Sequence, residues 1–257
     1  MLCLTKWYLD CVTDAGDAAI LYWASLAWGG WHLRYGAALL STQEDGAATR
    51  YTLQPGPAPA MSPTHLEWQC PRLDSAGSWA LTEEVLERTL LDVPKGSIRW
   101  RCACPRAEAT VHVGGYTLRG LGYVECLTMT LAPWRLPIDG LRWGRFHSRD
   151  ATVVWIDWRG PLPRSWVFVN GVELSRAVVS SAQVDFPGDG TRLSLEQGRV
   201  LRSGQLRQTA LRSVRAMTAL VPKWRHAREE KRLGRGTLLG PRGASPGWAL
   251  YEQVVWP

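Results

Sequence analysis

Lys6-Trp7-Tyr8-Leu9-Asp10 opens the chain with a short aromatic stretch whose character returns near the middle of the sequence, in Leu141-Arg142-Trp143-Gly144-Arg145-Phe146. Each stretch leads to a similar closing segment, Gly122-Tyr123-Val124-Glu125 in the first half and Ala249-Leu250-Tyr251-Glu252 in the second. The two closing glutamates are 127 residues apart (252 − 125), close to half of the 257 residues. A fixed period of this size indicates a duplicated β domain.

Half-buried strands are predicted along most of the chain, because apolar and polar residues alternate and aromatic residues are frequent. The clearest such segments are Ile20–Trp28, Ile98–Cys102, Thr152–Trp158 and Trp166–Val169. Turn formers such as Gly114-Gly115 and Asn170-Gly171 separate strands and allow the positive φ angles of tight hairpins. The sequence therefore predicts an all-β protein built as an antiparallel, up-and-down meander.

A domain boundary is predicted at Ala132–Pro137, where two prolines interrupt the strand pattern just before the second copy. The first β domain would then cover residues 1–132 and the second residues 133–257. The proline-rich segment Gln54–Pro63 cannot donate a regular ladder of hydrogen bonds, so we expect an exposed loop inside the first domain.

Two segments fit more than one kind of element. Thr82–Leu91 is compatible with a short helix or with the start of a strand. Leu206–Val221 fits helical and strand periods equally well, and we expect a strand there only because the first copy has a strand-rich segment before its closing glutamate.

The positive charge of the chain is regional. Residues 199–242 contain twelve Lys or Arg and two Glu, a local charge of +10 against +7 for the whole chain. Leu, Val and Met are interleaved with these charges and no aromatic series accompanies them, so we interpret the stretch as a solvated face and predict no nucleic-acid binding. Attraction to an anionic membrane surface is the functional use we expect for it.

The cysteines and the amino terminus point to a cytoplasmic protein. The six Cys have neither the spacing of a zinc site nor the density of a secreted disulfide scaffold, and they are predicted to be reduced and mostly buried. Cys102 and Cys104 are expected on the same strand face. The first residues lack the basic and apolar regions of a signal peptide, and no apolar run is long enough for a membrane helix.

Neither a metal nor a cofactor is predicted. The histidines form no i,i+4 pair and keep no ligand spacing with Cys or carboxylates. The glycine-rich loops of nucleotide sites and the Gly-x-Ser-x-Gly elbow of serine hydrolases are absent from the sequence. Any chemistry must then come from the protein side chains.

The candidate proton donor is Glu125. Side chains alternate along a strand, so Tyr123 and Glu125 should lie on one face. A carboxyl group against aromatic walls has its charged form disfavoured, which raises its pKa and suits it to donate a proton near neutrality. Nearby indole rings would stabilise a developing positive charge through their π faces. We expect Tyr123 to orient the acid.

The same rule groups Trp143, Arg145 and His147 on one face of their strand and Trp155 and Asp157 on one face of the next. We expect one interior to hold all of them, with Arg145 tuning the acid and the others contacting substrate. A structural interpretation stays open for Trp143 and Arg145, because a Trp stacked against an Arg plugs many small β-barrels. For His147, a solvated turn is the commoner interpretation.

Four segments carry a distinctive combined pattern, namely Gly120–Glu125, Trp134–Pro137, Leu141–Phe146 and Trp155–Trp158. Together they resemble the lipocalin-like carotenoid hydratases (hydroxyneurosporene synthases) and the AttH-like group, over most of the chain. The resemblance implies a tandem pair of lipocalin-like (calycin) antiparallel β-barrel or half-barrel domains, and acid-initiated addition of water to the terminal double bond of an acyclic carotenoid. Hydratases of this family carry an Asp-His pair followed closely by Asn-Trp-Gly, whereas here Glu125 precedes Cys126 and the Trp-Gly pair is Trp143-Gly144.

The leading hypothesis is a cofactor-independent acid/base enzyme that acts on a lipophilic, polyene- or terpenoid-like substrate as a hydratase, isomerase or cyclase. The alternative is a carrier that holds a small apolar ligand in the same cavity without chemistry. A third possibility is a remnant duplicate that only scaffolds a partner. Glu252, at the matching place in the second copy, would contact substrate in its own cavity or pack at a domain interface.

Overall fold

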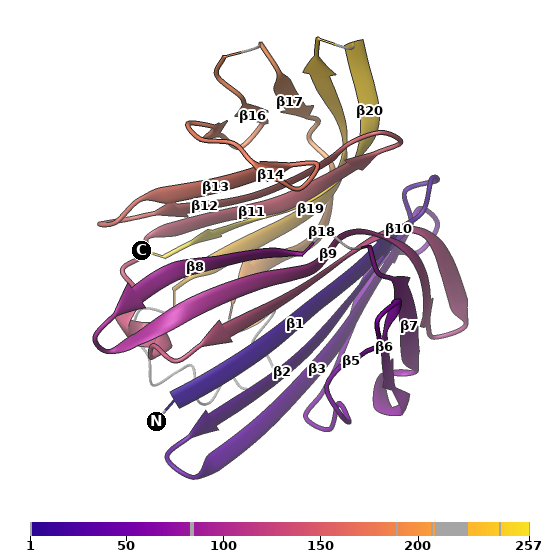
Figure 1. The fold of residues 1–257 in the computed structure, drawn as a ribbon. Helices are drawn as coiled ribbons and strands as arrows, with labels where there is room; N and C mark the ends of the chain where they lie inside the picture. Colours follow the sequence, from indigo (N-terminus) through magenta and orange to yellow (C-terminus); the bar gives the residue numbers. More distant parts are fainter. Residues whose placement is uncertain are drawn as a thin grey trace. The chain divides into compact units, whose positions relative to one another are not determined.

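A computed structural model describes residues 2–82, 85–188, 190–206, 208, 226–241 and 243–256. The chain divides into two compact units, Met1–Leu136 and Pro137–Pro257. Almost every regular element is a strand, so the all-β prediction is confirmed (Figure 1). The predicted domain limits, 1–132 and 133–257, remain a prediction about which parts of the chain fold independently.

The first unit contains ten strands among its described residues. They are β1 (Leu2–Val12), β2 (Ala18–Trp28), β3 (Trp31–Thr42), β4 (Gly46–Thr52), β5 (Ala60–Met61), β6 (His65–Cys70), β7 (Ser75–Ala80), β8 (Leu86–Val93), β9 (Gly96–Val113) and β10 (Tyr116–Met129), with the short 3-10 helices η1 (Pro71–Leu73) and η2 (Pro133–Arg135). The strands form one antiparallel sheet in the order β4-β3-β2-β1-β10-β9-β7-β6-β5, and β8 pairs with β9.

The second unit repeats this topology strand by strand. Its strands are β11 (Gly140–Ser148), β12 (Thr152–Arg159), β13 (Arg164–Val169), β14 (Val172–Glu173), β15 (Val178–Val179), β16 (Gln183–Asp185), β17 (Arg192–Leu195), β18 (Arg199–Gln205), β19 (Arg228–Gly240) and β20 (Gly243–Val255). Their order is β14-β13-β12-β11-β20-β19-β17-β16-β15, with β18 paired to β19. Each strand thus takes the place of the strand ten positions earlier, which confirms the duplication.

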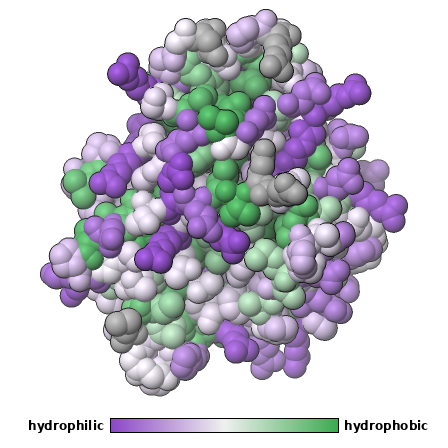
Figure 2. All heavy atoms as spheres, in the orientation of Figure 1, coloured by the Kyte–Doolittle hydropathy of each residue, from purple (hydrophilic) through white to green (hydrophobic). Residues whose placement is uncertain are grey.

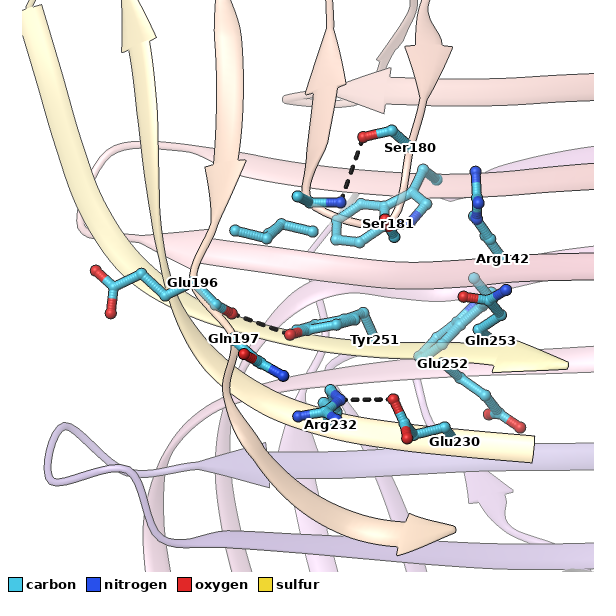
Figure 3. Close-up of a pocket in the computed structure, with 14 residues that line it drawn as sticks. Arg142, Ser180, Ser181, Glu196, Gln197, Glu230, Arg232, Tyr251, Glu252 and Gln253 are labelled. Atoms are coloured by element: carbon cyan, nitrogen blue, oxygen red, sulfur yellow. Dashed lines mark hydrogen bonds and ion pairs between the residues drawn. The ribbon is translucent and has the colours of Figure 1, made fainter. Parts of the chain in front are cut away.

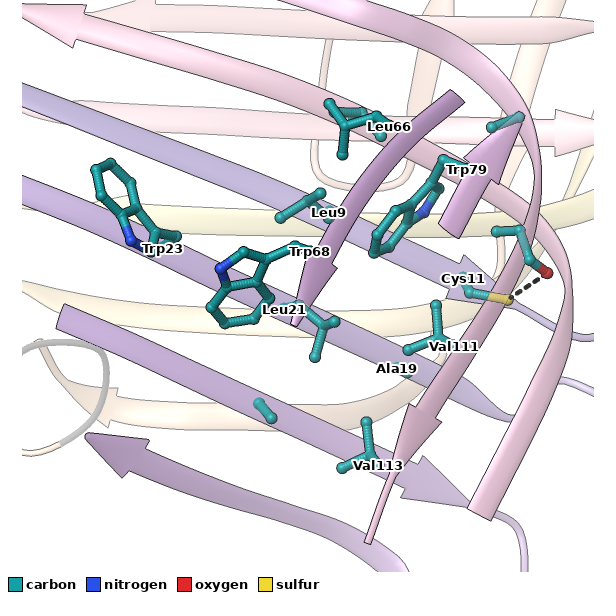
Figure 4. Close-up of a cluster of buried hydrophobic side chains, with 14 of the residues drawn as sticks. Leu9, Cys11, Ala19, Leu21, Trp23, Leu66, Trp68, Trp79, Val111 and Val113 are labelled. Carbon is teal, nitrogen blue, oxygen red and sulfur yellow. Dashed lines mark hydrogen bonds between the residues drawn. The ribbon is translucent and has the colours of Figure 1, made fainter. Parts of the chain in front are cut away.

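Indole rings dominate the core of the first unit (Figure 4). Trp79 is fully buried, and its Nε1 donates a 2.7 Å hydrogen bond to the carbonyl oxygen of Asp10. The Trp79 ring lies directly on Gly77, where an added Cβ would be 2.4 Å from it, so only glycine fits there. Glycine leaves room for a large ring to pack directly on the backbone, which allows the sheet to bend towards its apolar core.

The proline-rich segment is mostly exposed, as predicted, and its buried side contacts this core. Pro55 and Pro59 are buried, and the short strand β5 lies at the end of the segment. Trp23 Nε1 donates to the carbonyl oxygen of Gly56 at 3.3 Å, and Trp68 Nε1 donates to that of Pro57 at 3.1 Å. The prolines leave backbone carbonyls without ladder partners, and the core indoles supply donors for them.

The predicted hairpin turns are confirmed. Gly114 and Gly115 have φ angles of 60° and 77° between β9 and β10, and Asn170 and Gly171 have 47° and 80° between β13 and β14. Consecutive positive φ angles belong to the two-residue turns that match the twist of antiparallel strands.

The structure describes one of the two segments that the sequence leaves ambiguous between helix and strand, and only a small part of the other. Leu86–Val93 is strand β8, so the strand interpretation of Thr82–Leu91 holds where the structure describes it. The strand expected at Leu206–Val221 concerns residues 207 and 209–221, which lie outside the described residues.

The described part of the chain contains no helix with the length and apolar character to cross a membrane. On the face drawn in Figure 2, hydrophilic side chains are interspersed with small hydrophobic patches. Such a mixed surface is ordinary for a folded chain, because single exposed apolar side chains need no partner.

Candidate functional site

Glu125 on β10 is the centre of a buried polar and aromatic cluster, with only 9% of its surface exposed. Its Oε2 accepts a 2.6 Å hydrogen bond from Trp100 Nε1 and a 2.7 Å hydrogen bond from the Tyr123 hydroxyl. The predicted contact between Tyr123 and Glu125 on one strand face is therefore present. Trp100 was not predicted as a partner, because it comes from the neighbouring strand β9.

Two further tyrosines complete the cluster. The register of the sheet places Tyr8 of β1 opposite Glu125 and Tyr22 of β2 opposite Tyr8. The Tyr8 ring contacts those of Tyr22 and Tyr123 edge to face, with centroids 5.4 Å and 6.0 Å apart. Leu9 and Leu21, the next residues along these strands, belong to the indole-rich core, so the cluster occupies the opposite face of the sheet.

A β-bulge brings Cys102 into the cluster and separates it from Cys104. On β9, Cys102 pairs with Glu125 and Cys104 pairs with Val124, so Ala103 is the extra residue. Cys104 packs in the apolar core with Val124, whereas Cys102 lies beside Glu125. The prediction that both thiols share a strand face is wrong, because the bulge shifts the alternation by one residue.

The neighbours of Glu125 hold their protons firmly. Burial raises the pKa of the Tyr123 hydroxyl well above its ordinary value, and the nearby Cys102 and Glu125 raise it further. Burial, followed by the charge of Glu125, raises the pKa of the Cys102 thiol well above its ordinary value. At neutral pH Tyr123 is therefore a fixed hydrogen-bond donor to the carboxyl group.

Glu252 occupies the equivalent position in the second unit. It lies opposite Trp143 of β11 and Lys231 of β19, just as Glu125 lies opposite Tyr8 and Cys102. The fully buried Lys231 forms an ion pair with Glu252, and its Nζ lies 5.0 Å from the centre of the Trp143 ring. The partly exposed Glu252 therefore neutralises a buried lysine, whereas Glu125 accepts hydrogen bonds from neutral side chains.

The basic stretch is only partly the solvated face that the sequence predicts. Arg202 Nε lies 2.8 Å from Glu229 Oε1 in a buried ion pair, and Lys231 is buried as well. Cross-strand pairing of β18 and β19 places Arg202 opposite Lys231 on the buried face of the sheet. Charges with opposite partners can be buried, which a count along the sequence does not reveal.

The remaining predicted residues lie on two faces of the second sheet. Trp143, Arg145 and His147 share one face of β11, as predicted. Trp155 instead lies opposite Gly144, on the other face, where it packs in the core of the second unit with Phe146. The single interior expected for all of them is thus a wrong prediction, because the register between strands decides which faces coincide.

Arg145 and His147 are buried, at 0% and 3% exposure. The solvated-turn interpretation of His147 is therefore wrong. Arg145 Nη1 donates to the carbonyl oxygen of Trp248 at 3.5 Å within the second unit, whereas Glu125 belongs to the first. Tuning of Glu125 by Arg145 stays a prediction.

Asp157 is held by other polar groups. Its carboxylate accepts hydrogen bonds from Arg159 Nε at 2.7 Å and from the Ser165 hydroxyl at 2.6 Å. It lies opposite Arg142, on the same face as Trp155. A role for Asp157 in contacting substrate would have to compete with these bonds.

A cavity of 360 Å³ opens in the second unit (Figure 3). Its lining residues are Arg142, Trp143, Trp155, Ser180, Ser181, Ala182, Leu195, Glu196, Gln197, Glu230, Arg232, Tyr251, Glu252 and Gln253. Three residues predicted to contact substrate, Trp143, Trp155 and Glu252, are among them. Glu125 and Tyr123 belong to the first unit and do not line it.

Sequence reasoning missed most of this lining. Arg142 and Tyr251 lie inside the two repeated motifs, and their alternation with Trp143 and Glu252 was the available signal that they face the other side. Ser180–Ala182 connect β15 to β16, and Leu195–Gln197 cover the end of β17 and the residues after it, where the strands are too short for a local pattern. Within the described ranges, the structure shows no group of His, Cys, Asp and Glu suited to hold a metal ion.

Comparison with known proteins identifies the fold. No protein-family profile and no curated protein matches the sequence. Among solved structures, an AttH candidate from Nitrosomonas europaea matches with a TM-score of 0.61 and 10% identity over 99% of this chain and 92% of that one. CghA with bound Sch210972 matches with a TM-score of 0.60 and 11% identity, over 99% and 88%.

Kievitone hydratase from Nectria haematococca is a further structural match, with a TM-score of 0.56 and 10% identity over 98% of this chain and 88% of that one. Identities this low show the fold alone. The chain has the tandem lipocalin-like fold that these proteins share, so the fold predicted from the AttH-like resemblance is confirmed.

Proposed function

We propose that this protein is an acid/base enzyme that transfers a proton from Glu125 to a carbon–carbon double bond of a lipophilic substrate. The observation that carries the proposal is a buried carboxyl group whose Oε2 receives two hydrogen bonds, from Trp100 and Tyr123, inside a cluster of tyrosine rings. These two neutral donors hold the Glu125 carboxyl group in one position, and a general acid must be positioned within reach of the atom it protonates.

The two donors stabilise the state that follows proton transfer. As Glu125 gives its proton to one alkene carbon, the other carbon becomes positively charged and the carboxyl group becomes an anion. The Trp100 and Tyr123 hydrogen bonds then strengthen, because they point at the developing negative charge. The Tyr8 and Tyr22 rings lie on the same face and offer electron-rich surfaces to a cation.

The fate of the cation defines the reaction. Addition of water, with loss of one proton back to Glu125, gives hydration. Loss of a proton from a neighbouring carbon gives isomerisation, and attack by a second double bond followed by proton loss gives cyclisation. Each course returns Glu125 to its protonated form and requires no cofactor.

The structural comparisons support this reaction class without defining it. Kievitone hydratase, which shares the fold, is named for a hydration. Because one fold hosts unrelated activities, the argument for proton transfer rests on the Glu125 cluster. A polyene- or terpenoid-like substrate follows from the resemblance and from the aromatic character of the cluster.

The proposed setting is cytoplasmic and next to a membrane. A lipophilic substrate would partition into lipid, and the basic stretch 199–242 would bring the protein to an anionic membrane surface. No nucleic-acid partner is proposed.

Solvent labelling tests the proposed reaction. The purified protein is incubated with a panel of acyclic polyenes and terpenoid alkenes, once in deuterium oxide and once in water enriched in heavy oxygen, and products are analysed by mass spectrometry. Hydration incorporates both labels, whereas isomerisation or cyclisation incorporates only deuterium. Absence of both labels from every compound in the panel would overturn the proposal.

The Glu125→Gln variant assigns the proton donor. The amide still accepts hydrogen bonds but carries no acidic proton, so turnover should fall by about a hundredfold or more with the fold preserved. Glu67→Gln, on the exposed side of β6, is the matched control and should leave turnover unchanged. Equal turnover of Glu125→Gln and the parent protein would remove Glu125 from the mechanism.

A carrier function is the second candidate, and the cavity of the second unit favours it. A carrier would return every compound unlabelled and retain some of them through gel filtration. The labelling experiment therefore separates the two functions.

A further inference from the structure

The floor of the second-unit cavity combines two rows of side chains. Arg142 lies opposite Gln253, and the next row places Trp155 and Tyr251 on either side of Gly144. A Cβ on Gly144 would lie 2.2 Å from the Trp155 ring, so the glycine is what allows the indole to lie flat over the strand. The floor is thus polar at one end and aromatic at the other.

Arg142 brings a positive charge that its surroundings do not balance. Its Nη1 donates to the carbonyl oxygen of Val179 at 3.1 Å, and Arg159 Nη2 donates to the same oxygen at 3.0 Å. The carboxylate on the strand position opposite Arg142, that of Asp157, forms its ion pair with Arg159 at 2.7 Å. Two guanidinium groups therefore share one carboxylate and one carbonyl.

The hydrogen bonds of Arg142 are also incomplete. Among the residues that the structure describes, its Nε has no partner although the atom is buried. Burial and the charge of Arg159 lower the pKa of Arg142, which still stays protonated at neutral pH. A buried donor without an acceptor is costly, and an oxyanion beside the guanidinium would satisfy it.

The other charges of the cavity have partners of their own or point elsewhere. Arg232 Nε pairs with Glu230 Oε1 at 2.7 Å, and Glu252 pairs with Lys231, so these charges cancel. Figure 3 shows the carboxylate of Glu196 directed away from Arg142, and the backbone oxygen of Glu196 accepts the Tyr251 hydroxyl at 3.0 Å. The Arg142 end of the cavity is therefore positive.

The opposite end is apolar and held in place. Trp155 is 2% exposed, and Leu195 at the end of β17 and Ala182 between β15 and β16 line the same cavity. Tyr251 is fixed by its hydroxyl, which also accepts a 3.3 Å hydrogen bond from the Gly198 amide. A volume of 360 Å³ lies at the small end of the range for ligand pockets.

From this geometry we infer that the cavity of the second unit binds a small amphipathic carboxylate, with its acid group at the Arg142 guanidinium and its apolar body against Trp155 and Leu195. A planar guanidinium recognises a carboxylate through paired hydrogen bonds, and Gln253 adds an amide beside it. The inference goes beyond the proton transfer at Glu125, because the site belongs to the other unit and needs no reaction.

A matched pair of probes tests the inference. Phenylbutyrate and its neutral amide have nearly the same shape and differ in charge, and their affinities for the full chain are measured by calorimetry. The acid should bind about tenfold or more tightly than the amide, because hydrogen bonds to a charged partner are stronger than neutral ones. Equal affinities, or no detectable binding of the acid, would refute the assignment.

Variants locate the binding. Arg142→Gln should reduce the affinity for the acid to that for the amide, whereas Arg192→Gln, which alters an exposed pair with Asp185 in the same unit, should leave both affinities unchanged. Arg142→Lys keeps the charge without the paired geometry and should give an intermediate value. Unchanged affinity for the acid in a folded Arg142→Gln protein would place the ligand elsewhere. If that variant does not fold, the contrast between acid and amide in the parent protein decides.

Discussion

The closing strands of the two units place a glutamate at the same position in different surroundings. Glu125 is surrounded by neutral donors, Trp100 and Tyr123, whereas Glu252 forms an ion pair with the buried Lys231. The donors to Glu125 are neutral side chains, whereas the carboxylate of Glu252 neutralises a buried ammonium group. At equivalent positions of the two repeats, Glu125 is therefore the candidate acid and Glu252 a structural counter-charge.

The largest contrast should come from replacing each glutamate by glutamine. Glu252→Gln leaves Lys231 buried without its counter-charge, which should lower the free energy of unfolding by about 3 kcal/mol. Glu125→Gln keeps an acceptor for both donors and should cost about 1 kcal/mol or less. Urea unfolding of the two variants and the parent protein measures both changes.

A double variant checks the cause of this difference. Replacing Lys231 by Met and Glu252 by Leu removes both charges and should restore most of the stability, since apolar side chains of similar volume often substitute well for a buried pair. If Glu125→Gln proves as destabilising as Glu252→Gln, the two sites do not differ as described.

The next effect concerns the donors to Glu125. Tyr123→Phe removes the 2.7 Å hydrogen bond and should lower the free energy of unfolding by about 1.5 kcal/mol. Trp100→Phe removes the 2.6 Å hydrogen bond and also leaves a small cavity, so its cost should be at least as large. Tyr51→Phe is the control, because the ring of that partly exposed tyrosine contacts Tyr35 and its hydroxyl makes no hydrogen bond that is seen among the described residues. Thermal unfolding that distinguishes neither variant from the control would show that the hydrogen bonds contribute nothing.

Much of the fold could be predicted from local sequence patterns. Alternation and turn chemistry are properties of neighbouring residues, so the hairpins at Gly114-Gly115 and Asn170-Gly171 and the contact of Tyr123 with Glu125 follow from them. The duplication was visible because matching positions of the two copies keep a Glu at the closing strand. Both units have the same strand order, so residues at matching sequence positions also occupy matching positions in the two sheets.

Relations between strands could not be predicted in the same way. The bulge at Ala103, which moves Cys102 beside Glu125, and the placement of Trp155 opposite Gly144 depend on register across strands. A shift of one residue reverses every side chain, and no single strand encodes it. Lys231 was assigned to a solvated face for the same reason, because its partner Glu252 lies on another strand.

A smaller effect should appear at alkaline pH and belong to the first unit, which contains all six Cys. Burial is the main cause that raises the pKa of Cys126 to about 11, and the charge of Glu125 adds to it. The folded chain then keeps a proton that the unfolded chain loses above about pH 8.5, so stability present below that pH is lost as the pH rises towards 11.

The loss attributable to Cys126 should be on the order of 1 kcal/mol, since partial exposure weakens the effect. Cys126→Ala should make the alkaline decline of the unfolding free energy shallower, and Cys3→Ala, on the exposed start of β1, serves as the control. An identical decline in Cys126→Ala and the parent protein would contradict the assignment.

The smallest effect contrasts an exposed ion pair of the first unit with a buried pair of the second. Arg101 Nε lies 2.9 Å from Glu87 Oε1 with side chains 43% and 66% exposed, whereas those of Arg202 and Glu229 are 7% and 0% exposed. Water screens the exposed pair, so Glu87→Gln should cost no more than about 0.5 kcal/mol, and the cost should vanish in high salt. Glu229→Gln leaves the Arg202 charge buried, and because salt does not reach it, its larger cost should persist in the same buffers. Urea unfolding at low and high salt separates the two cases: a salt-insensitive cost for Glu87→Gln would mean that exposure does not decide what an ion pair contributes in these sheets.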